Sequence, residues 1–230
     1  MPTVLVTGSN RGLGLELSRQ YAEDGWRVIA CCRKPRGARE LAALARRHGG
    51  VSVHGLDVTD EEGIRELARE LRGEKIDILF NNAGTSAPRR QEFGPIDTAG
   101  WVEAFRVNAI GPYIMAAAFA GHVARSDRKV IAAMSSIMGS VEENGSGGYY
   151  AYRSSKAALN MVMKGLAADL RPRGIITVCL HPGWVRTRMG GPGATQTPEE
   201  SAAGLRRQLA SLTQADSGRF ITYLGEPLPW

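Results

Sequence analysis

Short apolar runs rich in β-branched residues alternate with segments of helical periodicity along the whole chain, and this alternation constrains the fold more than any other feature. Strands are predicted at 3–6, 27–31, 51–54, 76–80, 129–134, 175–180 and 220–223, with helices between them. This pattern is typical of an α/β fold in which helices cover both faces of one sheet. We therefore predict a doubly wound, seven-stranded parallel sheet. No repeat or linker divides the 230 residues, so one domain spanning 1–230 is expected.

The longest predicted helix, 98–125, raises the question of a membrane span. Residues 107–124 contain no Asp, Glu, Lys or Arg, which is about the minimum length for crossing a bilayer. Asn108, Gly111, Pro112 and His122 make the stretch only weakly hydrophobic. We therefore predict a buried or subunit-contacting helix with a break near Gly111-Pro112, and no membrane association.

Charge, cysteine and histidine patterns exclude several classes of protein. The net charge is +6, and the 24 arginines are spread from Arg11 to Arg219. A nucleic-acid surface would gather them in one patch, so a solvated surface with a few phosphate ligands is favoured and no nucleic-acid partner is predicted. The three cysteines, Cys31, Cys32 and Cys179, form no CxxC pair and are interpreted as buried thiols, the first two on opposite faces of a strand. The histidines lack metal-ligand spacing, and the N-terminus runs straight into a strand, so we expect a cytoplasmic protein without a metal site.

A glycine-rich turn, Gly8-x3-Gly12-x-Gly14, follows the first predicted strand and opens the first helix. Glycines allow close approach of the backbone to a pyrophosphate, and the helix N-terminus supplies N–H groups and a positive dipole end. The spacing differs from the commoner Gly-x-Gly-x-x-Gly. The order of strand, turn and helix nevertheless predicts a dinucleotide site in a Rossmann fold.

The end of the second predicted strand indicates which dinucleotide is bound. An acidic residue there would bind the ribose 2′-hydroxyl of NAD, whereas arginine accommodates the 2′-phosphate of NADP. The sequence has Cys32-Arg33-Lys34 and no acid, and Arg11 in the glycine loop adds a second positive charge. NADP (as NADPH) is therefore favoured over NAD, although two ordinary surface arginines would also explain the pattern.

Tyr152 and Lys156 lie four residues apart, which places both side chains on one helix face. An ammonium at about 4 Å would attract a phenolate by about 4 kcal/mol at an effective dielectric of about 20. That attraction would bring the tyrosine pKa from about 10 towards neutrality and make Tyr152 a general acid or base. The spacing alone is weak evidence, because Tyr149 and Arg153 share it.

Together these motifs resemble the short-chain dehydrogenase/reductase family in its compact single-domain form, over essentially the whole chain. Thr7 to Gly14 matches the family's cofactor loop, and Asn81-Asn82-Ala83-Gly84 its structural motif. Tyr152-x3-Lys156 matches the catalytic motif, and 182–187 the nicotinamide-side segment. The stretches 150–160 and 181–187 and the closing Pro229-Trp230 are similar to the C-factor/sniffer-like carbonyl reductase branch.

The resemblance implies a reductase mechanism and a set of site residues. NADPH would deliver hydride to a carbonyl carbon while Tyr152 protonates the oxygen, with Lys156 lowering the Tyr152 pKa and Asn108 keeping a water that links Lys156 to solvent. The implied catalytic residues are Asn108, Ser136, Tyr152 and Lys156. The implied cofactor-binding residues are Gly8, Asn10, Arg11, Gly12, Leu13, Gly14, Arg33, Asp57, Val58, Asn81, Ala83, Gly84, Tyr152, Lys156, Pro182, Gly183, Val185 and Thr187.

Two points of the resemblance stay open. Ser136 precedes Tyr152 by more residues than in most members, so Ser135 competes for its role. Ser136 is preferred because Ser136 to Gly139 matches the family's Ser-x-x-Gly, and only one of two neighbouring side chains can face the site. In the substrate pocket, Ser136, Met138, Trp184 and Met189 are candidates, with core or surface roles equally open for the last three.

The substrate is expected to be a small carbonyl compound or alcohol of unspecified identity, and a homodimer or a monomer would both fit. An NADPH-binding signalling protein with little turnover is the competing interpretation. The complete Asn108–Ser136–Tyr152–Lys156 set argues against it, because a sensor has no need of an activated tyrosine.

Overall fold

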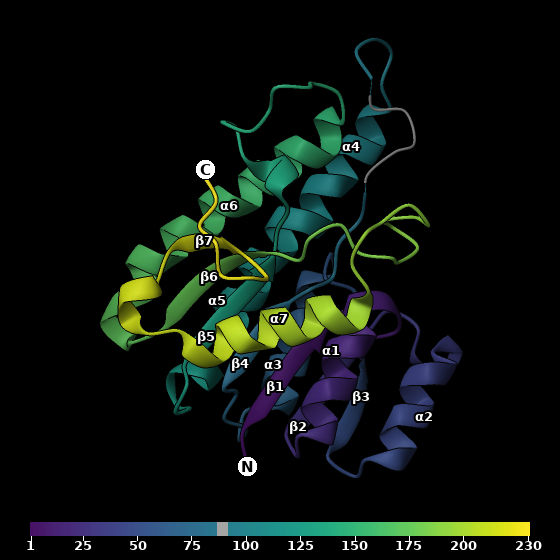
Figure 1. Cartoon of the computed structure of the whole chain (residues 1–230). Coiled ribbons are helices and arrows are strands. Elements are labelled where there is room, and N and C mark those ends of the chain that lie inside the picture. Colours follow the sequence, from purple (N-terminus) through teal and green to yellow (C-terminus); the bar gives the residue numbers. More distant parts are fainter. Residues whose placement is uncertain (87–91) are drawn as a thin grey trace.

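The computed structural model describes residues 1–86 and 92–230, and in them seven strands form one sheet (Figure 1). They are β1 (Thr3–Thr7), β2 (Arg27–Cys32), β3 (Val51–Gly55), β4 (Ile78–Asn81), β5 (Val130–Met134), β6 (Ile176–His181) and β7 (Arg219–Thr222). Every neighbouring pair is parallel, in the order β3-β2-β1-β4-β5-β6-β7. The predicted doubly wound α/β sheet of Rossmann type is confirmed.

The order of the strands fixes where a ligand can bind. β1 pairs with β2 on one side and with β4 on the other, so the chain winds outward in opposite directions from these two central strands. Ligands of open α/β sheets lie beyond the carboxyl ends of the strands at such a switch point. The glycine turn after β1 and the Asn81-Asn82 segment after β4 meet there.

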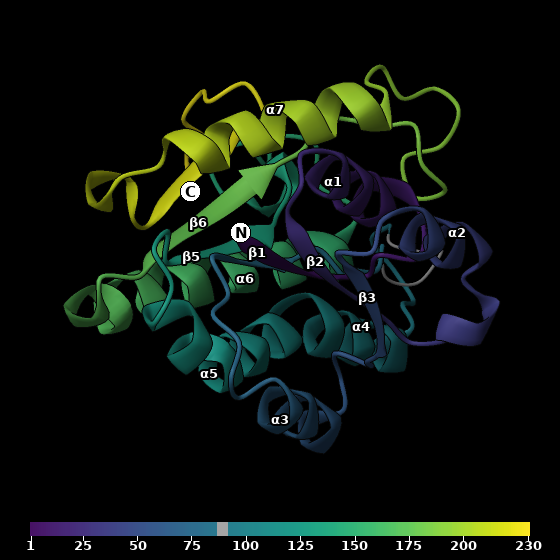
Figure 2. The same ribbon diagram turned by 90° about the horizontal axis from the view of Figure 1, so that it is seen from below.

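The helices are divided between the two faces of the sheet (Figure 2). They are α1 (Gly12–Glu23), α2 (Arg39–Arg47), α3 (Glu61–Glu70), α4 (Thr98–Phe105), α5 (Gly111–Ala124), α6 (Tyr150–Leu170) and α7 (Pro198–Ser211). On the face covered by α1, α2 and α7, Val4 packs with Leu17 and Leu205. On the opposite face, covered by α3, α5 and α6, Leu5 packs with Phe119.

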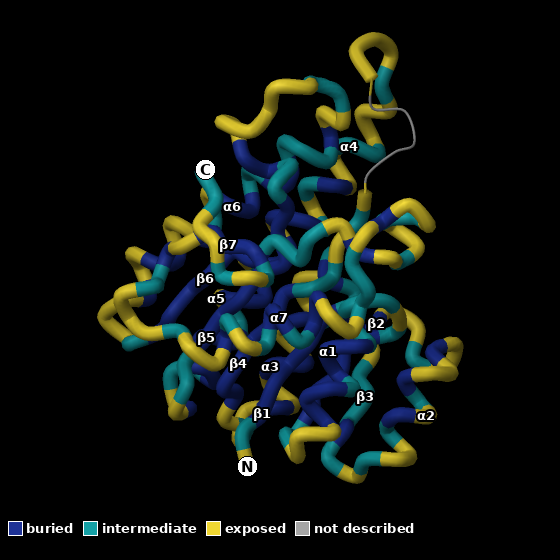
Figure 3. The backbone as a smooth tube through the Cα atoms, viewed as in Figure 1, coloured by how far each residue is buried: buried dark blue, intermediate teal, exposed yellow. Residues whose placement is uncertain are grey.

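Both faces of the sheet are buried, which explains the near-continuous apolar runs of its strands (Figure 3). The adjacent Cys31 and Cys32 belong to the cores on opposite faces, as a strand period of two requires. Cys31, Cys32 and Cys179 are all buried free thiols.

Two boundaries differ from the prediction. The strand predicted at 76–80 begins only at Ile78, although the main chain of Asp77 still donates to the Thr3 carbonyl at 2.9 Å and accepts from the Val130 nitrogen at 3.0 Å. The helix predicted between the second and third strands begins at Arg39, because Pro35–Gly37 forms a separate 3₁₀ turn.

The helix predicted at 98–125 is interrupted earlier than expected, by a π turn at Arg106–Ile110. Pro112 falls in the first turn of α5, directly after this π turn. In the described part of the chain, 98–124 is the one helical stretch that passes a length and hydropathy test for a membrane span. Because 56% of its most apolar window is buried inside the protein, it is typical of a core helix.

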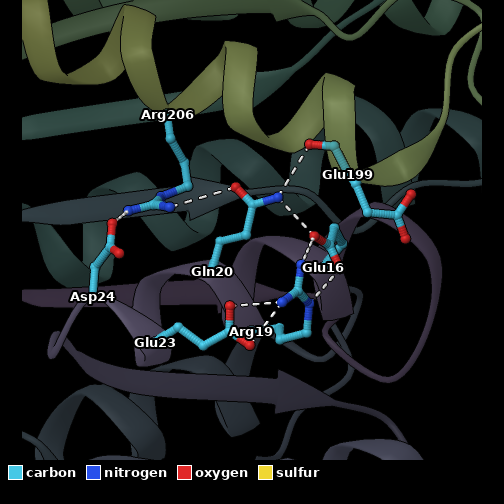
Figure 4. A network of polar contacts seen from close by, with 7 residues as sticks. All are labelled: Glu16, Arg19, Gln20, Glu23, Asp24, Glu199 and Arg206. Atoms are coloured by element: carbon cyan, nitrogen blue, oxygen red, sulfur yellow. Dashed lines mark hydrogen bonds and ion pairs between the residues drawn. The ribbon is translucent and has the colours of Figure 1, made fainter.

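Helices α1 and α7 are joined by a polar network (Figure 4). Gln20 donates from Nε2 to the main-chain oxygen of Glu199 at 3.1 Å, and Arg206 donates to Gln20 Oε1 at 3.4 Å. Arg206 also forms an ion pair with Asp24 and lies over the Tyr21 ring, 4.5 Å from its centroid. The first turn of α7 is therefore held against the helix that begins at the glycine loop.

Candidate active site

The glycine loop is shaped by steric limits on two of its glycines. Gly8 adopts a φ of +71°, and a Cβ added there would lie 3.0 Å from the Cα of Ala83. A Cβ on Gly14 would lie 2.4 Å from the carbonyl oxygen of Gly8. Helix α1 begins with no side-chain cap and no acidic residue in its first turn. Its first N–H groups and dipole are thus suited to an anion such as a pyrophosphate.

The segment after β4 is tied to the end of β1. Thr7 Oγ1 accepts hydrogen bonds from the main-chain nitrogens of Asn82 and Ala83 at 3.1 and 3.0 Å, and Asn82 Nδ2 donates to the Thr7 carbonyl at 2.8 Å. Asn81 is 3% exposed, yet neither polar atom of its amide has a hydrogen-bond partner among the described residues. A buried unpaired amide costs about 1–3 kcal/mol, which favours a ligand contact here.

The arginines predicted to bind phosphate are both exposed, and their charges interact. Partial desolvation lowers the pKa of Arg11, and the neighbouring charges of Arg188 and Arg33 lower it further. Burial acts to raise the pKa of Asp57, but hydrogen bonds from the nitrogen and hydroxyl of Thr59, together with the charge of Arg33, lower it overall. The region after β2 and β3 is therefore predominantly positive.

Helix α6 places Tyr152 and Lys156 on one face, with the Lys156 ammonium 5.9 Å from the centroid of the tyrosine ring. Lys156 is 4% exposed, and its Nζ donates to the main-chain oxygen of Met134 at 2.7 Å. Burial lowers the pKa of Lys156 to about 8. A buried ammonium in this position is poised to exchange a proton near neutral pH.

The electrostatic state of Tyr152 differs from the expectation. Burial raises the pKa of Tyr152, and a hydrogen bond with the Ser136 side chain offsets only part of that rise. The lowering expected from Lys156 is not seen, because the ammonium is directed at Met134 rather than at the phenol oxygen. The hydroxyl of Tyr152 is therefore protonated at neutral pH.

The two candidate serines point in different directions. Ser135 Oγ donates to Asn160 Oδ1 at 2.6 Å, inside the packing between β5 and α6. Ser136 makes the hydrogen bond with Tyr152, and its Oγ accepts from the Met138 nitrogen at 3.2 Å. Of the two serines, the structure therefore brings Ser136 to the tyrosine.

Asn108 lies in the π turn and is fully buried. Its Oδ1 accepts from the Thr85 nitrogen at 2.9 Å, and its Nδ2 donates to the Thr85 carbonyl and to Ser155 Oγ, each also at 2.9 Å. Both amide protons are thus used, and Oδ1 keeps one lone pair. Asn108 therefore joins the loop after β4 to α6 through Ser155, the residue that precedes Lys156 in the sequence.

The segment after β6 folds over the glycine loop. Gly183 adopts a φ of +81°, and Val185 pairs with Gln196 in a single parallel bridge. A Cβ on Gly12 would lie 3.4 Å from Cγ2 of Thr187, so Thr187 approaches the start of α1. Pro182 is fixed to α7, because its carbonyl accepts a hydrogen bond of 2.7 Å from Ser201.

The candidate substrate residues are more exposed than a closed pocket would leave them. Trp184 and Met189 are 56% and 52% exposed, and Trp184 Nε1 donates to the Gly190 carbonyl at 2.8 Å. Met138 is half-buried next to Ser136. These side chains border the open side of the site.

Sequence reasoning missed Arg188 and gave Gly139 no structural role beyond a motif match. Arg188 adds a third guanidinium to the charges around Arg11. A Cβ on Gly139 would lie 2.8 Å from the Cβ of Lys156, so only glycine lets the turn after Ser136 pack on α6. The Ser-x-x-Gly spacing was the available signal for Gly139, whereas Arg188 lies in a loop whose fold the sequence did not indicate.

The residues assembled here fit a dinucleotide. The crowded glycine turn, the uncapped start of α1, the unpaired amide of Asn81 and the arginine charges lie along one edge of the sheet, beyond the ends of β1, β2 and β4. No group of three His, Cys, Asp or Glu side chains suited to a metal ion occurs within 1–86 and 92–230.

Comparison with known proteins agrees with this geometry. A family model described as short chain dehydrogenase matches residues 2–197. C-signal of Myxococcus xanthus is 41% identical over 167 residues, which cover 73% of this chain and all of that protein. The solved structure of the carbonyl reductase Sniffer of D. melanogaster superimposes with a TM-score of 0.94 and 33% identity, covering both chains completely. NADPH-bound carbonyl reductase from chicken fatty liver gives a TM-score of 0.93 and 33% identity, covering 100% of this chain and 99% of that one. The chain belongs to the short-chain dehydrogenase/reductase family.

Proposed function

We propose that the protein is an NADPH-dependent oxidoreductase that reduces an aldehyde or ketone to an alcohol, with Tyr152 as the general acid. The surroundings of Tyr152 carry the proposal. Its hydroxyl is hydrogen-bonded with the Ser136 side chain, and the buried ammonium of Lys156 lies 5.9 Å from the centroid of its ring, so a proton donor, a second hydroxyl and a cation meet at one place. Family membership and the likeness to two carbonyl reductases support the reaction class.

The proposed cofactor is NADPH, held by the glycine loop, by Asp57 and Val58, and by Asn81 to Gly84. When bound, its nicotinamide supplies the hydride that reduces the carbonyl carbon. Arg11 and Arg33 support NADPH over NADH, because no acid follows β2 to bind a ribose 2′-hydroxyl. The NADPH named in the chicken carbonyl reductase structure points the same way.

The side chains of this chain handle the proton. Ser136 donates a hydrogen bond to the substrate oxygen and keeps the Tyr152 hydroxyl in place, and Tyr152 passes its proton to that oxygen. Lys156, with a pKa of about 8, is protonated in large part at neutral pH and returns a proton to Tyr152. The free lone pair of Asn108 Oδ1 is a place where a water could join Lys156 to solvent.

A regulatory protein that binds NADPH with little turnover is not favoured. Ser136 and Lys156 are both arranged around a partly buried Tyr152, and binding alone would not need that arrangement. The same residues would also serve alcohol oxidation, the reverse reaction, so the proposed direction of reduction rests on the proposed use of NADPH as the hydride donor.

Substitution of Tyr152 tests the proposal. We expect Tyr152→Phe to lose about 10²–10⁴-fold in NADPH-dependent turnover of aldehydes, ketones and diketones, while the Kd for NADPH stays within about twofold. Tyr150→Phe is the matched control, because Tyr150 is on the same helix but 37% exposed. Unchanged turnover in Tyr152→Phe would remove Tyr152 as the acid, and tight NADPH binding without turnover on any carbonyl in the wild type would favour the regulatory alternative.

A homodimer and a cytoplasmic location remain expectations. Val102, Ile110 and Tyr113, on α4, the π turn and α5, are 61%, 48% and 51% exposed, which is a high exposure for apolar side chains. A second copy of the chain would cover them. Light scattering of the purified protein would decide between dimer and monomer.

A further inference from the structure

Helix α6 carries a third polar residue in line with Tyr152 and Lys156. Asn160 lies four residues after Lys156 and eight after Tyr152, so the three side chains share one face of the helix. The same face packs on the turn after β5, residues 136–139, because the Cβ position of Gly139 adjoins Lys156. The helix face that carries Tyr152 thus meets the turn that carries Ser136, called here the Ser136 turn.

The amide of Asn160 is buried and bonds to both ends of the Ser136 turn. Asn160 is 3% exposed, its Oδ1 accepts a hydrogen bond of 2.6 Å from Ser135 Oγ, and its Nδ2 donates to the Gly139 carbonyl at 3.2 Å. The orientation of the amide is fixed, because a carbonyl oxygen can only accept and the amide nitrogen must therefore face Gly139. One side chain of α6 thus binds the residue before Ser136 and the residue that ends its turn.

The Ser136 turn is closed by its own hydrogen bonds. The Gly139 nitrogen donates to the Ser136 carbonyl at 2.8 Å, and Ser136 Oγ accepts from the Met138 nitrogen at 3.2 Å. The Ser140 nitrogen donates to the Ile137 carbonyl at 2.9 Å. A turn tied internally in this way moves as one body. Its distance from α6, and with it the position of the Ser136 hydroxyl, is therefore set by the bonds that cross to the helix.

The distance between the Ser136 turn and α6 matters for the chemistry. The hydroxyl of Ser136 comes from the turn and that of Tyr152 from the helix, and the two are hydrogen-bonded. In the proposed reaction both hydroxyls act on one substrate oxygen, so they must be held at one separation. A displacement of about 1 Å from the reactive geometry can cost about 10²-fold in rate. Asn160 lies two helical turns from Tyr152, so its amide acts through the turn and not on the substrate oxygen.

We propose that Asn160 is a positioning residue for the reaction: its bond to the Gly139 carbonyl holds the Ser136 turn at the distance from α6 that carbonyl reduction needs. This rests on the proposed roles of Ser136 and Tyr152. The two bonds of the amide have different consequences. The bond from Ser135 holds the amide itself, whereas the bond to Gly139 acts on the turn and so on the hydroxyl of Ser136.

A double-mutant cycle between Asn160→Leu and Ser136→Ala tests the proposal. Asn160→Leu fills a similar space and removes both bonds. In the otherwise wild-type protein we expect kcat to fall at least about tenfold, and no further than in Ser136→Ala, while the Kd for NADPH stays within about twofold. In the Ser136→Ala background no serine hydroxyl is left to position, so the same change should alter kcat less than about twofold. The fall in melting temperature should be equal in both backgrounds, because the same two bonds are lost in each.

Thr177→Val is the matched control. Thr177 is fully buried on β6, and its Oγ1 donates to the Met163 carbonyl of α6 at 3.0 Å, so it too joins a strand to this helix, but away from the Ser136 turn. Its substitution should lower the melting temperature and leave kcat within about twofold where the protein is folded. Asn160→Ala removes the same bonds as Asn160→Leu without adding bulk, and it takes the place of Asn160→Leu in the cycle if leucine prevents folding.

Two results of the cycle would overturn the proposal. A fall in kcat that is as large in the Ser136→Ala background as in the wild type would show that Asn160 serves only the stability of the fold. Unchanged kcat in Asn160→Leu would show that the turn keeps its position without the amide. Full turnover in Ser136→Ala alone would instead overturn the proposed role of Ser136, on which the positioning of its turn depends.

Discussion

Lys156 donates a hydrogen bond of 2.7 Å to the main-chain oxygen of Met134, which joins the face of α6 that carries Tyr152 to the last residue of β5. The bond holds the ammonium group where water scarcely reaches it, so the charged form of Lys156 is destabilised. That cost appears as a pKa of about 8, well below the ordinary value of 10.5. The buried charge of Lys156 thus lowers the free energy of unfolding while it suits the group to proton transfer. Substitution of Lys156 can measure the stability that is lost.

Lys156→Met should stabilise the protein at neutral pH by about 1–3 kcal/mol and abolish turnover, because it removes a buried charge while filling the same space. The folded pKa lies below the unfolded one, so the unfolded state binds more protons between about pH 8 and 10.5 and wild-type stability rises through that window. The advantage of the variant should therefore shrink from about pH 7 to about pH 9.5 in denaturant titrations. An advantage that grows with pH would contradict the assignment.

His181, at the end of β6, should make the protein sensitive to acid. Burial lowers its pKa to about 4 from 6.5, and its Nδ1 has no hydrogen-bond partner in the described structure. The neutral form of His181 makes its full contribution to the free energy of unfolding above about pH 6.5. This contribution is lost as the pH falls towards 4, because the unfolded state takes up the proton first. We expect up to about 3 kcal/mol of stability to be lost over that window in the wild type and less in His181→Gln. Parallel denaturation curves for the two proteins across this range would refute the assignment.

Ser135 and Ser136 should separate stability from catalysis. Ser135→Ala leaves the buried Asn160 Oδ1 without its donor and should cost about 1–3 kcal/mol, with turnover retained at low temperature. Ser136→Ala should lose turnover at least tenfold with little change in melting temperature, because its hydroxyl serves Tyr152 at the site. Melting temperatures and turnover measured on both variants test this prediction. Loss of turnover in Ser135→Ala together with loss of stability in Ser136→Ala would transfer the catalytic role to Ser135.

Gly139→Ala should disturb the site by changing how the turn after Ser136 packs on α6. The new Cβ would lie 2.8 Å from the Cβ of Lys156 and 2.9 Å from its carbonyl carbon, so the turn after Ser136 must move away from α6. A cost of about 1–3 kcal/mol is expected, together with reduced turnover. Gly145→Ala is the control, because a Cβ there meets nothing within 4 Å. Equal effects of the two substitutions on melting temperature and turnover would show that the contact with Lys156 is unimportant.

The sheet could be predicted because each strand has its own local sequence pattern, and that pattern recurs along the chain. Each buried strand is a short apolar run ending in small or polar residues, and the alternation with helices leaves few other folds. The opposite faces of Cys31 and Cys32 follow from the same two-residue period. Ser136 was preferred over Ser135 from its spacing to Gly139, and the packing of Gly139 against Lys156 gives that spacing its physical reason.

Features that depend on contacts between distant segments could not be predicted. The π turn at Asn108 reflects bonds to Thr85 and Ser155, which no local pattern near Asn108 encodes. The raised pKa of Tyr152 depends on how far the ring is buried and on the direction of the Lys156 ammonium, neither of which follows from a spacing of four residues. The electrostatic effect of Arg188 on Arg11 depends on the approach of Thr187 to Gly12, which joins segments far apart in the sequence.

The bridge between Val185 and Gln196 has a consequence for how this protein can diverge. It closes the segment at its base, where the main-chain nitrogen of Trp184 also donates a hydrogen bond of 2.8 Å to Gln196 Oε1, and the first turn of α7 is held against α1. Gly190 is fixed, because a Cβ there would lie 2.0 Å from the carbonyl oxygen of Val185, but the residues between Gly191 and Thr195 can change in number or composition without displacing Tyr152 on α6. Natural variants should accumulate insertions there, and a new substrate preference could arise in one step without the loss of stability that a change in the sheet would bring.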